Sequence, residues 1–115
     1  MFVQIVTFDG PRGPELVAAS DRAGRERISP LIEANEDLKR GLLGGIRALS
    51  PDGGEVFIGL GTDREVFDTL RDVIMNSELL PGEDPALLPG PSSVEYYQVD
   101  TVMGPISTAL QGDVR

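Results

Sequence analysis

The 115-residue chain contains no cysteine, no histidine and no tryptophan. Without cysteine it can form neither a disulfide framework nor a thiolate metal site. Without histidine, imidazole-based catalysis, haem ligation through histidine and histidine–zinc sites are excluded as well. We therefore expect a protein with no metal site and no cofactor.

Basic residues are few, with 10 lysines and arginines against 19 acidic residues and a net charge of -9. A field of this sign repels phosphate backbones and anionic lipid. The cluster of Arg22, Arg25 and Arg27 is interrupted by Glu26, which is typical of a solvated helix face. We expect neither a nucleic-acid partner nor a membrane partner.

Long apolar runs are also missing. No stretch of about 18 apolar residues is present to span a membrane. Residues 1–4 enter a strand-like run without the basic segment of a signal peptide, so the expectation is a cytoplasmic protein. The length is that of one domain, and hydrophobic residues make up 40% of the chain, enough for a core.

The segment 41–62 has the pattern of a β-hairpin, with two apolar runs on either side of the turn sequence SPDGG. Glycines in that turn can adopt positive φ. Two other segments are rich in β-branched and aromatic residues and end at Gly-Pro or Asp-Gly-Pro. The predicted strands are Phe2 to Phe8, about Leu42 to Leu49, Glu55 to about Gly61, and Val94 to Met103.

Two helices are predicted between the strands. The first covers Pro14 to about Asn35, and Pro30 is expected either to kink it or to restart it with Ser29 as a cap. The second begins at Thr62, which forms a capping box with Glu65, and continues to about residue 77.

The remaining segments are a loop and a tail. Residues 79–93 hold four prolines, and a connection of this length is either a lid or a packed surface loop. We divide the chain into a domain of residues 1–103 and a C-terminal tail of residues 104–115.

The element order βαββαβ predicts an α+β protein with the ferredoxin-like arrangement, a four-stranded antiparallel sheet with both helices on one face. The opposite face is apolar too, with Val3 and Ile5 on the first strand and Tyr97 and Val99 on the last. An uncovered apolar face favours a homodimer that packs sheet against sheet into an α+β barrel.

Several motifs carry a family resemblance over residues 1–103: FVQIVTF, ISPLIEAN, LLGGIRAL, EVFIGLG, TDREVFDTL and VEYYQVDTV. On these the chain resembles the dimeric α+β barrel superfamily, and particularly its antibiotic biosynthesis monooxygenase-like branch. That branch includes cofactor-independent oxygenases of aromatic polyketides and haem-degrading oxygenases. The resemblance implies a homodimer with a small hydrophobic or aromatic ligand.

The chain departs from this branch at the residues that carry its chemistry. The oxygenases typically have a tryptophan where the third strand meets the second helix, and here that residue is Gly61. They typically have an asparagine in the barrel strands, whereas Asn35 and Asn76 fall on helical segments. The haem-degrading members need a histidine. These departures argue against haem degradation and weaken the expectation of oxygenation.

The fold of the family places a ligand between the sheet and the helices, so polar residues facing that space are the candidate ligand-binding residues. They are Gln4, Asn35, Arg47, Tyr96, Gln98 and Asp100. Arg47 would stabilise an enolate, and Asp100 or a tyrosine would transfer a proton. The structural alternative is that Gln4 and Gln98 cross-pair or hydrogen-bond across the dimer, and that Arg47 and Asp100 form an ion pair or face solvent. No residue is assigned as catalytic.

Two functions from different classes follow. The first is a homodimeric small-molecule-binding barrel resembling cofactor-independent monooxygenases, acting on an aromatic or enolisable metabolite. The alternative is a structural or regulatory dimer whose cavity is filled by its own side chains, such as Phe57 and Phe67. A third reading, an accessory domain of a larger complex, needs partner contacts along residues 79–93.

Overall fold

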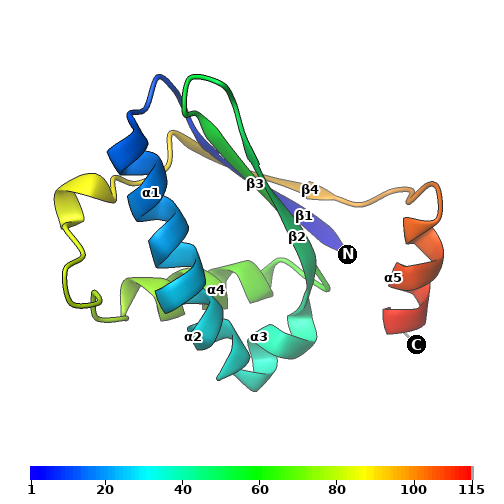
Figure 1. Cartoon of the computed structure of the whole chain (residues 1–115). Helices are drawn as coiled ribbons and strands as arrows, with labels where there is room; N and C mark the ends of the chain where they lie inside the picture. Colours follow the sequence, from blue (N-terminus) through cyan, green and yellow to red (C-terminus); the bar gives the residue numbers. More distant parts are fainter. Residues whose placement is uncertain (115) are drawn as a thin grey trace.

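The structure, a computed structural model, describes residues 1–114 and has two layers, a sheet and the helices α1 to α4 on one of its faces (Figure 1). The strands are β1 (Phe2–Phe8), β2 (Leu42–Leu49), β3 (Glu55–Gly61) and β4 (Ser93–Gln98). The helices are α1 (Pro14–Arg22), the π-helical segment η1 (Ala23–Ile28), α2 (Ser29–Glu33), α3 (Glu36–Gly41), α4 (Glu65–Met75), the 3₁₀ turn η2 (Pro85–Leu87) and α5 (Ile106–Val114). Within residues 1–114, no helix is both long enough and apolar enough to cross a membrane.

The four strands pair in the order β2-β3-β1-β4, and every neighbouring pair is antiparallel. This is the predicted ferredoxin-like sheet of a βαββαβ chain, which is therefore confirmed. β1, β2 and β3 begin and end at the predicted residues. We call the face covered by the helices the inner face and the opposite one the outer face.

The turn between β2 and β3 is closed by local hydrogen bonds. The Ser50 N–H donates to the Gly54 carbonyl over 2.8 Å, and Gly53 adopts a φ of 89°, which favours glycine. The Ser50 hydroxyl and the Gly54 N–H both donate to the Asp52 carboxylate. Because these bonds favour the charged form, they lower the pKa of Asp52.

β4 is shorter than predicted, because it ends at Gln98 and not at Met103. Gln98 pairs with Phe2, the first residue of β1, and the Val99 N–H still reaches the Met1 carbonyl at 2.9 Å. Beyond Val99 the neighbouring strand has ended, so the chain has nothing to pair with in the sheet. The prediction of a strand to Met103 is wrong for this reason.

The first predicted helix passes through Pro30 without a break. Pro30 lacks the N–H of a regular helical hydrogen bond. The helix accommodates it in η1, where the turns widen and the Ser29 N–H donates to the Gly24 carbonyl five residues back. α2 begins at Ser29, but Ser29 has helical backbone angles and not the extended angles of a cap, so the predicted capping role of Ser29 is wrong.

A separate short helix, α3, follows after Asn35. The Asn35 side chain caps it, with Oδ1 accepting from the Leu38 N–H at 3.1 Å. Glu36 and Asp37 lie in its first turn and Lys39 and Arg40 in its last, which suits the helix dipole at both ends.

The start of α4 differs from the predicted capping box. The residue whose side chain caps the first turn is Asp63, since Oδ1 accepts from the Val66 N–H at 3.0 Å. The Thr62 hydroxyl points instead toward the Asp63 carboxylate, at 3.4 Å. A carboxylate is the stronger acceptor at the positive end of a helix, so Asp63 takes the place that Thr62 was predicted to fill.

The loop of residues 79–93 packs on the first helical segment. Of the two predicted alternatives, a lid and a packed surface loop, this is the second. Arg27 forms an ion pair of 2.9 Å with the buried Glu83, and Arg22 donates to the Pro81 carbonyl at 2.8 Å. The predicted tail contains α5, which stands away from the two layers on an extended arm after β4 (Figure 1).

The core lies where α3 and α4 meet the sheet. Its fully buried side chains are Leu38 and Phe67, with Val66 nearly as well covered. Phe67 fits there because β3 has glycines beneath it: a Cβ on Gly61 would lie 3.0 Å from the Phe67 ring and 2.6 Å from Cγ1 of Val66. The glycines of β3 therefore allow helix and strand to approach closely.

The outer face of the sheet is apolar and uncovered in the monomer. Ile46, Ile58 and Ile5 are paired across β2, β3 and β1 and form a row of isoleucines, because directly opposed residues share a face. Ile46 remains 63% exposed. Tyr97, on β4, is 52% exposed on the same face.

The close approach at Gly61 makes a stability prediction. We expect Gly61→Ala to lower the free energy of unfolding by about 1–3 kcal/mol, because the added methyl group overlaps Val66 and Phe67. The matched change Gly24→Ala, in a helical segment, places a methyl group where no atom beyond the neighbouring helix backbone lies within 4 Å, and should stabilise by up to about 1 kcal/mol. Urea denaturation measures both, and equal effects would contradict the packing described for Gly61.

Candidate functional site

Alternate residues of the strands face the helices, and polar side chains occur among them. On β1 the inward residues include Phe2 and Gln4. Gln4 is opposed by Gly59 on β3 and by Tyr96 on β4, so these three residues lie in one row across the inner face. Gly45 on β2 completes that row.

Gln4 and Tyr96 form a hydrogen-bonded pair in this row. The Gln4 amide Nε2 donates to the Tyr96 hydroxyl at 3.1 Å. The Tyr96 ring lies 6.0 Å from the Phe67 ring, and the Arg64 guanidinium stacks over it at 4.5 Å. Because Gln4 is the donor, the hydroxyl proton of Tyr96 is free to donate to another group.

The two glycines of the row leave part of the inner face without side chains. The edge of the Phe67 ring covers Gly59, and it lies 3.4 Å from the position that a Cβ on Gly59 would take. At Gly45, the nearest atoms to a built Cβ are backbone atoms of Ile58 and Gly59, and no side-chain atom is among them. Gln4, Val6 and Phe57 are half-buried although they face the helices, so solvent reaches this part of the inner face.

A second group of polar residues lies on the inner face nearer the hairpin turn, and we call it the Glu55 cluster: Arg12, Ser20, Asp21, Arg47 and Glu55. The Glu55 side chain has an exposure of 0%. Its carboxylate accepts from the Ser20 hydroxyl at 2.8 Å and pairs with Arg47 at 2.7 Å and Arg12 at 3.7 Å. A carboxylate this deeply buried is costly unless it is paired and hydrogen-bonded in this way.

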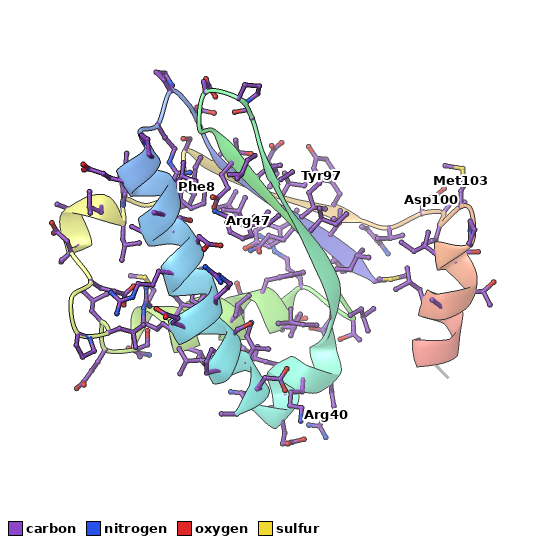
Figure 2. All side chains as sticks on the ribbon, in the orientation of Figure 1. Phe8, Arg40, Arg47, Tyr97, Asp100 and Met103 are labelled. Carbon is purple, nitrogen blue, oxygen red and sulfur yellow. The ribbon has the colours of Figure 1, made fainter. Side chains whose placement is uncertain are left out.

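Arg47 connects the sheet to α1. Besides its bond to Glu55, its guanidinium lies 3.4 Å from the Asp21 carboxylate and 6.0 Å from the centre of the Phe57 ring. Figure 2 shows Arg47 between α1 and the sheet, whereas Asp100 lies on the arm beside α5. The suggested ion pair between Arg47 and Asp100 is therefore wrong, because β4 ends before Asp100.

The structure brings together four of the six predicted site residues on the inner face: Gln4, Arg47, Tyr96 and Gln98. Gln98 is exposed at the end of β4, opposite Phe2, and does not cross-pair with Gln4, which bonds Tyr96. Asn35 caps α3, and Asp100 is exposed outside the sheet. A role in ligand binding remains a prediction for all six residues.

Sequence reasoning missed the Glu55 cluster. Strand alternation alone places Glu55 and Phe57 on the same face of β3, opposite to Val56 and Ile58. The hairpin register then places Arg47 directly opposite Phe57, beside Glu55. The signal was thus present in the hairpin, but Arg12, Ser20 and Asp21 join it through tertiary packing of α1.

Two of the hollows on the surface of the described residues are lined by none of Gln4, Tyr96 and Arg47. One, of about 630 Å³, lies at the hairpin turn and the end of β1, and is wide open to solvent. The other, of about 240 Å³, lies between α1 and the η2 loop. Among the described residues, no group of three or more acidic side chains has a geometry that would hold a metal ion.

Gly61 lies at the position where the oxygenases that the sequence resembles typically have a tryptophan. The space next to it is already filled by Val66 and Phe67, as the distances of 2.6 and 3.0 Å from a built Cβ show. An indole side chain does not fit at this position without displacing Phe67. The chain therefore lacks both the tryptophan and the room for it.

On the outer face, the Glu95 carboxylate accepts from the Tyr97 hydroxyl at 2.8 Å. This bond, and the negative charge of Glu95, raise the pKa of Tyr97. The two neighbouring tyrosines therefore differ in environment: Tyr96 bonds an amide on the inner face, and Tyr97 bonds a carboxylate on the outer face.

Three solved structures share this fold at low sequence identity. A dimeric ferredoxin-like protein from an uncultured marine organism is 11% identical, with a TM-score of 0.59 over 90% of this chain and 91% of that one. A monooxygenase from the gene ActVA-Orf6 of Streptomyces coelicolor, in complex with the ligand Nanaomycin D, is 20% identical, with a TM-score of 0.57 over 90% and 91%. An uncharacterized NIPSNAP domain protein from Burkholderia xenovorans is 16% identical, with a TM-score of 0.51 over 91% and 99%.

These likenesses confirm the predicted fold, including its resemblance to a monooxygenase of the same architecture. No family model and no curated protein sequence matches the chain.

The burial of Glu55 makes a second stability prediction. We expect Glu55→Ala to lower the free energy of unfolding by about 3–5 kcal/mol, because two arginines then lose a buried counter-charge. Glu26→Ala removes a carboxylate paired with Arg22 at the surface and should cost about 1 kcal/mol at most. Urea denaturation compares the two variants, and similar losses would show that Glu55 is not the centre of the cluster.

Proposed function

We propose that this protein is a homodimeric binder of small aromatic or enolisable molecules, held between the sheet and the helices of each protomer. The observation that carries the proposal is the Gln4–Tyr96 pair. It is half-buried on the inner face, and it leaves the Tyr96 hydroxyl proton available to a ligand.

The surroundings of the pair support an aromatic ligand. The half-buried side chains of Val6 and Phe57 offer an apolar surface one row away from Gln4. Gly45 contributes no side chain to the space above β2. A planar apolar molecule with one hydroxyl or carbonyl oxygen fits this combination of apolar surface and single polar anchor.

The homodimer is supported by the outer face. The isoleucine row and the exposed Tyr97 form an apolar surface that a monomer would leave in water. Sheet-on-sheet packing of two copies would bury it with a two-fold interface. The similar fold of a protein described as dimeric agrees with this arrangement.

The alternative, a structural or regulatory dimer with a filled interior, is favoured by Phe67, which packs tightly on Gly59 and Gly61. This filling is confined to the part of the inner face under α4, however, and the half-buried Gln4, Val6 and Phe57 lie beside it. We therefore prefer the ligand-binding function.

Oxygenation without a cofactor is a second candidate, favoured by the fold shared with a monooxygenase that binds Nanaomycin D. In such a reaction Tyr96 would hold a proton at a ligand oxygen, with Gln4 fixing the orientation of the hydroxyl. Because position 61 is glycine and not tryptophan, this candidate requires a substrate that reacts with oxygen without help from an indole side chain.

The ligand site is tested with 1-naphthol as the probe. We expect Tyr96→Phe to weaken its binding about fivefold, because one hydrogen bond of about 1 kcal/mol is lost. Tyr97→Phe is the matched control, since it removes the same atom from the outer face, and should bind as the wild type does. Isothermal titration calorimetry measures the affinities. No binding at millimolar concentration, or equal losses in both variants, would contradict the site.

The dimer is tested separately by sedimentation velocity. We expect the wild type to sediment as a dimer at micromolar concentration and Ile46→Glu to sediment as a monomer, because a charge would be buried in the isoleucine row. Met75→Glu is the control. It places the same charge on a residue of α4 that is 76% exposed, away from the outer face. A monomeric wild type would refute the sheet-to-sheet dimer.

A further inference from the structure

The outer face of the sheet consists of three rows of directly opposed residues, because opposed residues on paired strands share a face. Each row crosses the strands in the order β4, β1, β3, β2. The rows are Tyr97, Val3, Leu60 and Gly44, then Glu95, Ile5, Ile58 and Ile46, and last Ser93, Thr7, Val56 and Ala48. Within these three rows Glu95 is the only charged residue, so a partner of this face meets one carboxylate and no cation.

The two edges of the outer face differ in size and polarity. At the β4 edge, Tyr97 is 52% exposed and donates to the Glu95 carboxylate at 2.8 Å, on the side of the sheet away from α1 to α4 (Figure 2). At the β2 edge, the small residues Gly44 and Ala48 flank Ile46. A Cβ on Gly44 would have no atom beyond its chain neighbours within 4 Å. The face therefore has one bulky polar edge and one edge with open space.

Two identical sheets can face each other about a two-fold axis in two ways, because the axis lies in the plane between them. If the axis runs along the strands, β4 of one copy lies over β2 of the other. If the axis runs across the strands, each strand lies over its own copy. The edges β2 and β4 are three strand spacings, about 14 Å, apart, so the two dimers bring different residues together.

An axis across the strands gives a poor fit. Centred on the isoleucine row, it places the Glu95 carboxylates of the two copies opposite each other at the sheet spacing of about 10 Å. No cation of the three rows is available to offset their burial, which is costly for an unpaired charge. It also gathers the small residues Gly44 and Ala48 of both copies at one edge, where they leave a gap that close packing disfavours.

An axis along the strands removes both problems. It places the two Glu95 carboxylates at opposite edges of the interface, each beside the Ile46 side chain of the other copy. It also places Tyr97 of one copy over Gly44 of the other, so that a large side chain meets a position with open space. Alternation of large and small residues across facing positions is how packed layers interdigitate.

We infer that the outer face binds a second copy of this chain with the two-fold axis along the strands, and that Tyr97 of each copy packs over Gly44 of the other. Gly44 and Tyr97 then determine the orientation of the dimer. The inference rests on the proposed homodimer and specifies how its two sheets meet.

The test exchanges the sizes of the two residues and measures the dimer dissociation constant by sedimentation velocity over a concentration series. We expect Gly44→Phe to raise the dissociation constant at least about tenfold, because the new ring overlaps Tyr97 of the other copy. Gly44→Phe combined with Tyr97→Ala should recover at least about fivefold of this loss, since the phenyl ring then fills the space of the phenol. Gly90→Phe, in the loop of residues 79–93, adds the same ring where a Cβ has no neighbour within 4 Å and should leave the constant unchanged.

The outcomes separate the orientation from the dimer itself. If the wild type is a dimer and Gly44→Phe dimerises equally well, or if the two substitutions weaken the dimer additively, the orientation is overturned and the proposed dimer stands. If the wild type is a monomer at micromolar concentration, the dimer and the orientation both fail.

Cross-linking covers the case in which Gly44→Phe does not fold. The natural chain has no cysteine, so a short bismaleimide reacts only at introduced thiols. We expect a covalent dimer from the variant that combines Gly44→Cys with Tyr97→Cys, and none from either single variant, because each thiol then lies near the opposite edge from its own copy. No covalent dimer from the double variant, at a concentration where it sediments as a dimer, would overturn the inference.

Discussion

The register of β3 against its two neighbours is the constraint on which the rest of this structure depends. Because opposed residues share a face, this single register sends Glu55 and Phe57 inward and Val56 and Ile58 outward. A shift of one residue would put Glu55 in water and the isoleucine row against the helices. The bonds that close the Ser50–Gly54 turn fix the register locally, and the glycines of β3 fix it again where Phe67 packs.

Much of this fold follows from local patterns. The alternation of apolar residues and the SPDGG turn define the hairpin, and they are properties of neighbouring residues that a sequence displays directly. The element order then limits the topology to the ferredoxin-like sheet. The features that could not be predicted depend on partners far along the chain. β4 ends where β1 begins, and no pattern in VEYYQVDTV marks that point.

The candidate site also combines features that follow from local sequence with features that depend on residues far along the chain. Gln4 and Tyr96 were predicted as separate polar residues on two strands, but their pairing follows from a register between the first and the last strand. Glu55 was overlooked because a glutamate beside a turn is usually solvated. Its burial comes from α1, which brings Ser20 over the sheet, and from Arg12 in the loop before α1. A buried ion pair of this kind adds little net stability over an apolar core, so a contribution to stability alone does not explain why the ion pair is present.

The space between sheet and helices is divided into two unlike halves. Under α4, Gly59 and Gly61 let Phe67 rest on the backbone of β3, and this half is packed like an ordinary core. Under α1, half-buried strand side chains border the Glu55 cluster, and this half contains charged residues. The residue that closes the first half, Phe67, packs against Gly61, the position at which the oxygenases that the sequence resembles typically have a tryptophan. Tyr96 lies at the boundary of the two halves, packed against Phe67 and bonded to Gln4, so a ligand that reaches its hydroxyl would lie beside the packed half. The same choice of small and large residues along β3 thus accounts for the stable end of the domain and for the location of its proposed site.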